Sequence, residues 1–224
     1  MRAVLLAGLC ALAVCASAPP AEGQTAPRSM DEIISAAPDS EWRDIAPENL
    51  LFVRLADGGT VIIELAPSFA PNHVANVQAL ARAHFWDGTA VARSQDNYVV
   101  QWNGPDEGQP VSRGAAQERL EAEFARPAAG LSITRLQDPD SYAPVTGFAD
   151  GFPVAGNGER AWLTHCYGMV GAGRGDTTDS GDGSALYVVI GHAPRHLDRN
   201  VTLLGRVLQG MEHLSVMPRG TGPL

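Results

Sequence analysis

Residues 59–101 read GTVIIELAPSFAPNHVANVQALARAHFWDGTAVARSQDNYVVQ, and this stretch decides the fold. Residues 60–65 are rich in β-branched side chains, which favour a strand. Prolines interrupt that run, and the apolar spacing that follows predicts a helix over 71–83. Two short strands, 90–93 and 98–102, then flank a polar turn, which is typical of a hairpin. We therefore expect a strand, a helix and a hairpin in that order.

The predicted hairpin carries the polar side chains of greatest interest. Because strand side chains alternate between faces, Val91 and Arg93 are expected to share one face. The same rule pairs Val99 with Gln101 on the next strand, with Tyr98 at its edge. A guanidinium fixed among apolar neighbours suits a neutral polar substrate group beside a hydrophobic one. Taken alone, however, Arg93 is better interpreted as a solvated strand arginine.

These motifs resemble those of the cyclophilin-type peptidyl-prolyl cis-trans isomerases. The similar blocks follow the family's order along the chain: 59–65, 70–77, 85–88, 167–170, 184–189 and 197–211. One block would be weak evidence, whereas the ordered set spans most of residues 48–217 and is specific.

The resemblance implies which residues form a site. Arg93 aligns with the family's catalytic arginine, and Gln101 would hold its guanidinium or meet the substrate carbonyl. The residues implied to line a proline pocket are Tyr98, Val99, Tyr187 and Leu197, with His196 at the rim where the family has a tryptophan. The same apolar side chains would serve equally well as plain core, and only the resemblance separates the two interpretations.

The family's pattern is not kept everywhere. Ala185 stands where a glutamine is usual, Val201 replaces a pocket histidine, and Arg174 replaces an asparagine. The turn after Arg93 lacks its usual Pro-Gly. Together with His196, these changes leave the arginine chemistry in place and bear on the affinity for substrate and for the macrocycle cyclosporin.

The resemblance implies a mainly β fold: a closed, eight-stranded antiparallel barrel capped by two helices. No strand-like run follows residue 217, so the final strand of that barrel is expected to be missing. The domain is assigned to residues 47–224, with a long insertion at about 103–165. This insertion is rich in Gly and Pro, and we expect surface loop there, including 147–158, with a helical turn at 117–124.

The N-terminus has the features of an export signal. A positive start and a short apolar core predict a signal peptide over residues 1–23, with a core too short to span a membrane. A polar leader or linker follows over 24–46, in which Ser29 and Glu32 are placed to cap a short helix. We therefore expect a periplasmic or secreted protein without a membrane span.

The net charge and the placement of the histidines indicate which classes of partner and cofactor to expect. The net charge of -9 argues against a nucleic-acid partner, which requires a basic surface. His192 and His196 have a metal-like spacing but lie around Pro194 without a third ligand, so no metal site is predicted. No cofactor is expected, since rotation about an amide breaks no covalent bond, and we expect a monomer.

The sequence supports two candidate functions from different classes, an enzyme and a binding module. The first is a peptidyl-prolyl cis-trans isomerase that acts on Xaa-Pro bonds of polypeptides and assists folding in the cell envelope, which Arg93 and Gln101 favour. The alternative is a peptide-binding module or chaperone of the same fold with little or no turnover, which the altered groove residues favour. A metallohydrolase would rest on scattered histidines alone.

Overall fold

The computed structural model describes residues 27–105 and 111–221, and its contacts divide the chain after Asp44. The expected signal peptide at 1–23 lies outside the described residues. In the first unit, helix α1 (Met30–Ala36) is followed by a 3₁₀ turn, η1 (Asp39–Glu41). The Ser29 hydroxyl accepts the Glu32 N–H and the Glu32 carboxylate accepts the Ser29 N–H, which confirms the predicted cap. No helix within the described ranges is long and apolar enough to cross a membrane.

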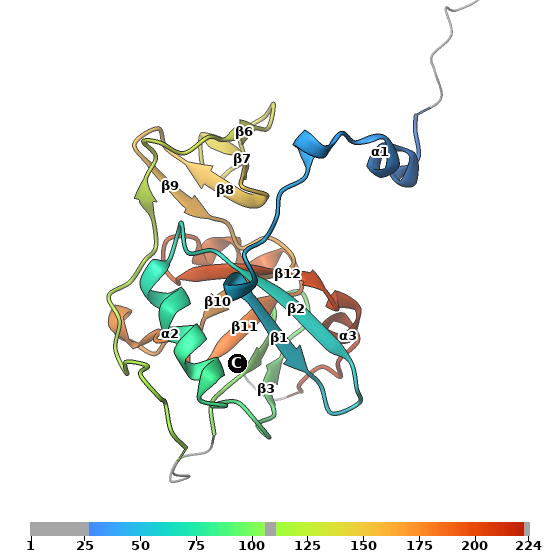
Figure 1. The fold of residues 1–224 in the computed structure, drawn as a ribbon. Helices are drawn as coiled ribbons and strands as arrows, with labels where there is room; N and C mark the ends of the chain where they lie inside the picture. The colour runs from blue at the N-terminus through green and yellow to red at the C-terminus, as the bar shows by residue number, and fades with distance from the viewer. Residues whose placement is uncertain (1–26, 106–110, 222–224) are drawn as a thin grey trace, which may run out of the picture. The chain divides into compact units, whose positions relative to one another are not determined.

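The second unit is built on a curled antiparallel sheet of seven strands, in the order β1-β2-β12-β10-β11-β4-β3 (Figure 1). The strands are β1 Leu50–Arg54, β2 Thr60–Leu65, β3 Val91–Ser94, β4 Val99–Trp102, β10 Met169–Ala172, β11 Leu186–Val189 and β12 Leu203–Gln209. Short 3₁₀ turns connect the domain's elements: η2 Pro47–Asn49, η3 Thr178–Ser180 and η4 Ala193–Leu197.

The closed eight-stranded barrel is not confirmed, because the sheet is open, with β1 and β3 at its edges. In the described part of the chain, β1 pairs with β2 alone, so its outer edge has no strand partner. The C-terminal segment lies at the opposite edge instead, where the Gly220 N–H donates to the Ser94 carbonyl at 2.7 Å.

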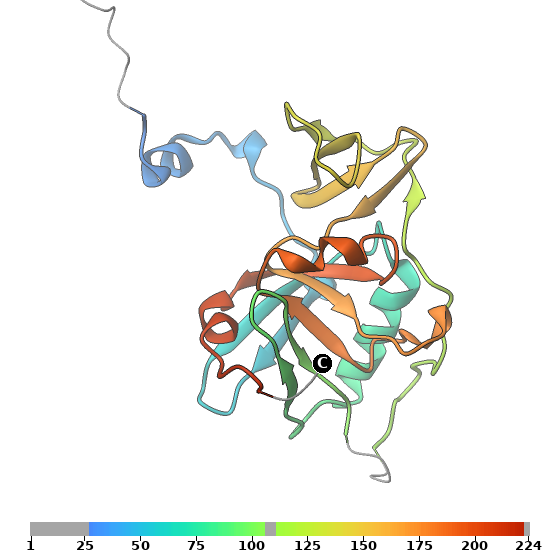
Figure 2. The same cartoon turned by 180° about the vertical axis from the view of Figure 1, so that it is seen from behind.

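The inner face of this sheet packs on two helices, α2 (Pro71–Arg82) and α3 (Met211–Ser215) (Figures 1 and 2). Helix α2 begins with a proline, whose missing N–H costs nothing in the first turn. Its predicted apolar stripe, which includes Val74 and Val77, is buried against strand residues such as Leu186 and Val188. The apolar face that recurs every 3.6 residues along α2 thus packs against the apolar face formed by alternate residues of the strands.

The later part of the insertion forms a sheet, which corrects the sequence-based expectation of surface loop throughout. Residues 126–163 form a second antiparallel sheet in the order β5-β9-β8-β7-β6. Its strands are β5 Arg126–Pro127, β6 Thr134–Arg135, β7 Val145–Ala149, β8 Phe152–Gly156 and β9 Arg160–Leu163. The helical turn expected at 117–124 is irregular backbone.

The glycines that suggested loop are needed by the sheet. Asp150 and Gly151 connect β7 to β8 with φ values of 49° and 76°, the left-handed pair of a type I′ hairpin turn. At Gly147 a Cβ would lie 2.2 Å from the Thr134 carbonyl oxygen, so only glycine permits the pairing of β6 with β7.

Apolar residues of the insertion pack on the outer face of the main sheet. Tyr187 and Val189 alternate with the inward Leu186 and Val188 and so face outward. They form one buried cluster with side chains of the insertion, including Phe152. The second sheet therefore covers the outer face of β11.

Candidate functional site

The strand register brings together the residues of the predicted site. Arg93 on β3 lies opposite Gln101 on β4, which in turn lies opposite Tyr187 on β11. Cross-strand partners have side chains on the same face of a sheet, so the three form a row across three strands. A β-bulge between Val91 and Arg93 pairs Val91 with the neighbour of Gln101 instead. The expectation that Val91 and Arg93 share a face is therefore wrong.

The half-buried Arg93 lies beside an aromatic ring. Its Cζ atom lies 5.9 Å from the centroid of the Tyr98 ring, near the limit of a cation–π contact. The same ring also stacks with His196 on η4, with centroids 6.0 Å apart and an interplanar angle of 16°. Tyr98 thus contacts both Arg93 and His196.

Gln101 does not bond to Arg93. Its side-chain amide donates to the Asn103 Oδ1 atom at 3.0 Å. Among residues 27–105 and 111–221, the Arg93 guanidinium has no hydrogen bond or ion pair. Its N–H donors therefore remain available to a bound molecule on the face shared with Gln101.

The side chains predicted to bind proline are largely covered. Val99 is 2% exposed and Tyr187 4% exposed, and both belong to the cluster shared with the insertion. Tyr98 packs at the margin of this cluster, whereas Leu197 lies half-buried at the end of η4. The structure thus joins Tyr98, Val99 and Tyr187 in one apolar group, and their role in binding proline stays a prediction.

A buried polar chain behind Tyr187 was missed by the sequence analysis. The Nδ1 atom of His165 lies 2.9 Å from Asp198 Oδ1, and its Nε2 atom lies 2.8 Å from the Tyr187 hydroxyl. The second carboxylate oxygen of Asp198 accepts from Arg195 Nε at 2.8 Å, and Arg195 also bonds Asp140 at 2.6 Å. No local spacing signals this set, because His165 and Asp198 are distant in sequence and meet only in the folded chain.

The protonation states of His165, Tyr187 and Asp198 follow from burial and hydrogen bonding. Burial lowers the pKa of His165, outweighing the opposing effect of Asp198. Burial also raises the pKa of Tyr187 well above its ordinary value. Burial would raise the pKa of Asp198, but hydrogen bonds from His165 and Arg195 lower it. A neutral imidazole therefore donates from Nδ1 to the carboxylate and accepts the phenol proton at Nε2.

This order of carboxylate, imidazole and hydroxyl is also that of a hydrolytic triad. Here the hydroxyl is a buried phenol whose pKa is raised, so it is neither accessible to a substrate nor activated as a nucleophile. We conclude that the Asp198–His165–Tyr187 chain is a brace that fixes the Tyr187 ring. No group of three or more His, Cys, Asp or Glu side chains in the described part of the chain could hold a metal ion.

Comparison with known proteins places this geometry in a family. The family model for "Cyclophilin type peptidyl-prolyl cis-trans isomerase/CLD" matches residues 51–222. The chain belongs to the cyclophilin family. Two proteins named "Probable peptidyl-prolyl cis-trans isomerase", from Brucella suis biovar 1 and Brucella abortus, are 31% and 30% identical over 107 residues. Each match covers 42% of this chain and 54% of the relative, so the chain spans about half the length of these curated relatives.

Solved structures agree with the fold. The cyclophilin AquaCyp293 from Hirschia baltica superposes with a TM-score of 0.64 at 25% identity, covering 88% of this chain and 77% of that one. A cyclophilin-type isomerase of Cryptosporidium parvum, solved in the presence of the dipeptide Ala-Pro, gives a TM-score of 0.51 at 12% identity. That match covers 77% of this chain and 88% of the other, and it supports the fold alone.

Because the chain belongs to the cyclophilin family, the row of side chains across β3, β4 and β11 is its candidate active site. In this cyclophilin the row combines an arginine with available donors, an amide and an aromatic ring on one face. The hydrogen bond between the Tyr187 hydroxyl and His165 fixes the orientation of the Tyr187 ring. The insertion adds a cover of apolar side chains over the same face.

Proposed function

We propose that the chain is a peptidyl-prolyl cis-trans isomerase acting on Xaa-Pro bonds of polypeptides. The observation that carries the proposal is the half-buried Arg93, whose available N–H donors lie on the face it shares with Gln101 and Tyr187. Family membership supports the same activity.

The proposed mechanism needs no cofactor. The peptide bond resists rotation because nitrogen shares its lone pair with the carbonyl, giving a barrier of roughly 18–20 kcal/mol. Twisting localises that lone pair on nitrogen, so a donor aimed at the nitrogen binds the twisted state better than either planar isomer. Such differential binding lowers the barrier. Arg93 suits this task, because its guanidinium stays protonated and its fork is rigid. Apolar contacts around Tyr98 would hold the ring while the rest of the peptide turns.

Replacing Arg93 tests the proposal. Loss of one preorganised donor typically costs about 2.7–4 kcal/mol, or a hundred- to a thousandfold in rate. Arg93→Ala should lose about that much turnover, and Arg93→Lys should recover little, since one ammonium cannot reproduce the fork. Exchange between cis and trans Xaa-Pro in a short peptide measures turnover, with circular dichroism as the folding control. Arg54→Ala, at an exposed arginine of β1, is the matched control. A folded Arg93→Ala protein with parental turnover would remove Arg93 from the mechanism.

A second candidate is a peptide-binding module or chaperone with little turnover. The burial of Val99 and Tyr187 beneath the insertion favours it, because a prolyl ring needs accessible apolar surface. Binding of a proline-containing peptide without measurable isomerisation by the unmodified protein would support this candidate over the enzyme.

We also propose that the protein acts as a monomer on folding polypeptides in the cell envelope, without a nucleic-acid partner. The apolar N-terminal run supports the location, and the negative net charge supports the absence of a nucleic-acid partner. Cell fractionation with N-terminal sequencing tests the location, and light scattering tests the oligomeric state. A cytoplasmic protein that keeps residue 1 would contradict the proposed export.

A further inference from the structure

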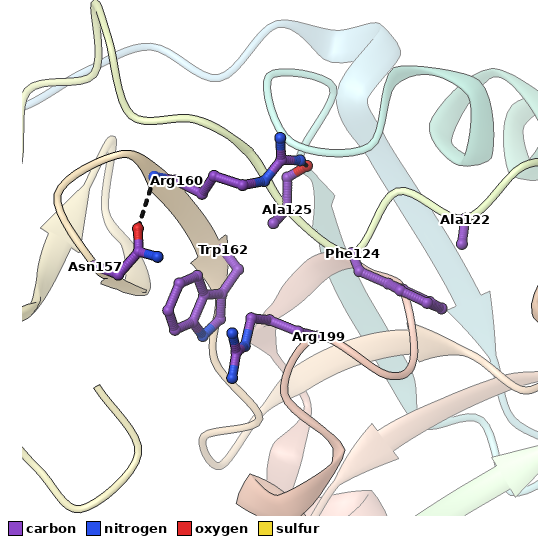
Figure 3. Close-up of a pocket in the computed structure, with 7 residues that line it drawn as sticks. All are labelled: Ala122, Phe124, Ala125, Asn157, Arg160, Trp162 and Arg199. Carbon is purple, nitrogen blue, oxygen red and sulfur yellow. Dashed lines mark hydrogen bonds between the residues drawn. The ribbon is translucent and has the colours of Figure 1, made fainter. Parts of the chain in front are cut away.

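A cavity of about 330 Å³ lies beside strand β9 (Figure 3), within the size range of small-ligand sites. Its walls come from three separate segments: the chain before β5, the β8–β9 hairpin and the turn after η4. Phe124 and Ala125 supply apolar surface, and Asn157, Trp162 and Arg199 supply polar groups. The cavity is distinct from the row formed by β3, β4 and β11.

An unpartnered donor lines the cavity. Trp162 is 3% exposed, and its indole N–H has no hydrogen-bond partner among the described residues. Burying such a group without an acceptor costs free energy, so buried indoles usually find a partner. Figure 3 shows the indole nitrogen on the side of the ring that faces the Arg199 guanidinium. An acceptor that enters beside Arg199 would satisfy it.

Arg199 supplies a positive charge at the same place. Its Cζ atom lies 4.7 Å from the centroid of the Trp162 ring, and it has no acidic partner within the described ranges. Its φ value of 62° is in the left-handed region, which is unfavourable for an arginine and easy for glycine. Backbone outliers of this kind gather at functional sites.

The other polar groups of the cavity are donors as well. The Asn157 Oδ1 atom accepts the backbone N–H groups of Glu159 and Arg160, which leaves its NH₂ to face Trp162 (Figure 3). Arg160 donates to the Ala125 carbonyl and adds a second guanidinium to the lining. None of the described lining residues is acidic.

Two of the carboxylates adjacent in sequence to the lining, those of Glu123 and Asp198, are engaged by other residues, whereas Glu121 and Glu159 are exposed residues. Glu123 bonds His73 Nδ1 at 2.6 Å, and Asp198 bonds His165 and Arg195. The cavity therefore presents donors and positive charge on a protein whose net charge is -9.

We propose that this cavity binds a carboxylate carried on a body of about amino-acid size. A guanidinium fork matches the two oxygens of a carboxylate, and the indole N–H can share one of them. Since a water molecule takes about 30 Å³, the cavity of about 330 Å³ is far larger than a lone small anion requires. Phe124 and Ala125 provide a surface for methylene groups. An acidic side chain of a polypeptide and a free dicarboxylate share this chemistry. The site does not depend on isomerase activity.

Titration of the indole N–H resonance of Trp162 tests the proposal in the full chain. Trp162→Phe assigns the resonance in ¹H–¹⁵N spectra. The probes are an acetylated, amidated Ala-Glu-Ala peptide, its Ala-Gln-Ala counterpart and succinate. We expect a saturable shift with the glutamate peptide and none with the glutamine peptide. Tighter binding of the peptide than of succinate would identify a polypeptide ligand, and the reverse would identify a free dicarboxylate.

Variants link the shift to the arginine. Arg199→Gln should weaken binding by about tenfold, the usual scale for a lost charged hydrogen bond. Arg199→Gly suits the left-handed backbone and should give the same loss while folding at least as well as the parent. Arg54→Gln removes an exposed arginine on β1 and should bind like the parent. Absence of a shift with both carboxylate probes, or an equal shift with the glutamine peptide, would overturn the proposal.

Discussion

Replacing Tyr187 by phenylalanine removes the hydroxyl from the buried, hydrogen-bonded series Asp198–His165–Tyr187. The His165 side chain is 0% exposed, so its Nε2 atom would lose its donor without gaining water. A buried polar atom left unsatisfied costs about 1–3 kcal/mol. The phenyl ring still fills the space beside Gly171, so little further cost from a cavity is expected. The free energy of unfolding should therefore fall by about 1–3 kcal/mol.

Urea unfolding followed by circular dichroism measures this change, and an unchanged m-value would confirm that the loss is one of stability. Tyr142→Phe is the matched control, because Tyr142 is 50% exposed and its ring lies 4.7 Å from Arg195 Cζ. That variant should change the free energy of unfolding by less than about 0.5 kcal/mol. If Tyr187→Phe changed it as little as the control, the hydroxyl would not be part of a brace.

Three further outcomes are expected. Because the pKa of His165 is lowered in the folded state, its contribution to stability is complete above pH of about 6.5 and is lost as the pH falls through the folded pKa; unfolding between pH 5 and 8 should show this slope, and His165→Gln should flatten it. At Gly171 a Cβ would lie 2.3 Å from the Tyr187 ring, so Gly171→Ala should cost about 1–3 kcal/mol of unfolding free energy; Gly175→Ala, where the nearest atom is a side-chain oxygen 3.6 Å away, is the control, and equal stability of the two variants would count against the packing argument. His196 offers less apolar area than a tryptophan, so cyclosporin should bind weakly and His196→Trp should tighten it in a fluorescence titration; no gain from the substitution would contradict this.

One missed element did have a local signal. Asp150-Gly151 is a strong hairpin turn pair, and apolar residues flank it on both sides. The strands of the insertion are short and contain Gly and Pro, which blur a two-residue period and favour an interpretation as loop. The pairing of β6 with β7 further depends on the absence of a side chain at Gly147, a requirement that only the neighbouring strand reveals.

Interactions between residues close together in the sequence determine several of the helices, strands and turns of this protein. The apolar stripe of α2, the alternation of β11 and the cap at Ser29 follow from periods and donors within a few residues. The adjacency of Arg93 and Gln101 follows from a short hairpin, so it too was predictable. Such features depend on backbone geometry that neighbouring residues share.

Tertiary structure decided what surrounds these groups. His165 meets Asp198 and Tyr187 only when the end of the insertion packs beside β11, and the pKa shifts follow from the resulting burial. The cover over Tyr187, the open edge of β1 and the cavity at Trp162 likewise depend on segments far apart in sequence. Burial and desolvation are properties of the packed chain, and no local pattern encodes them.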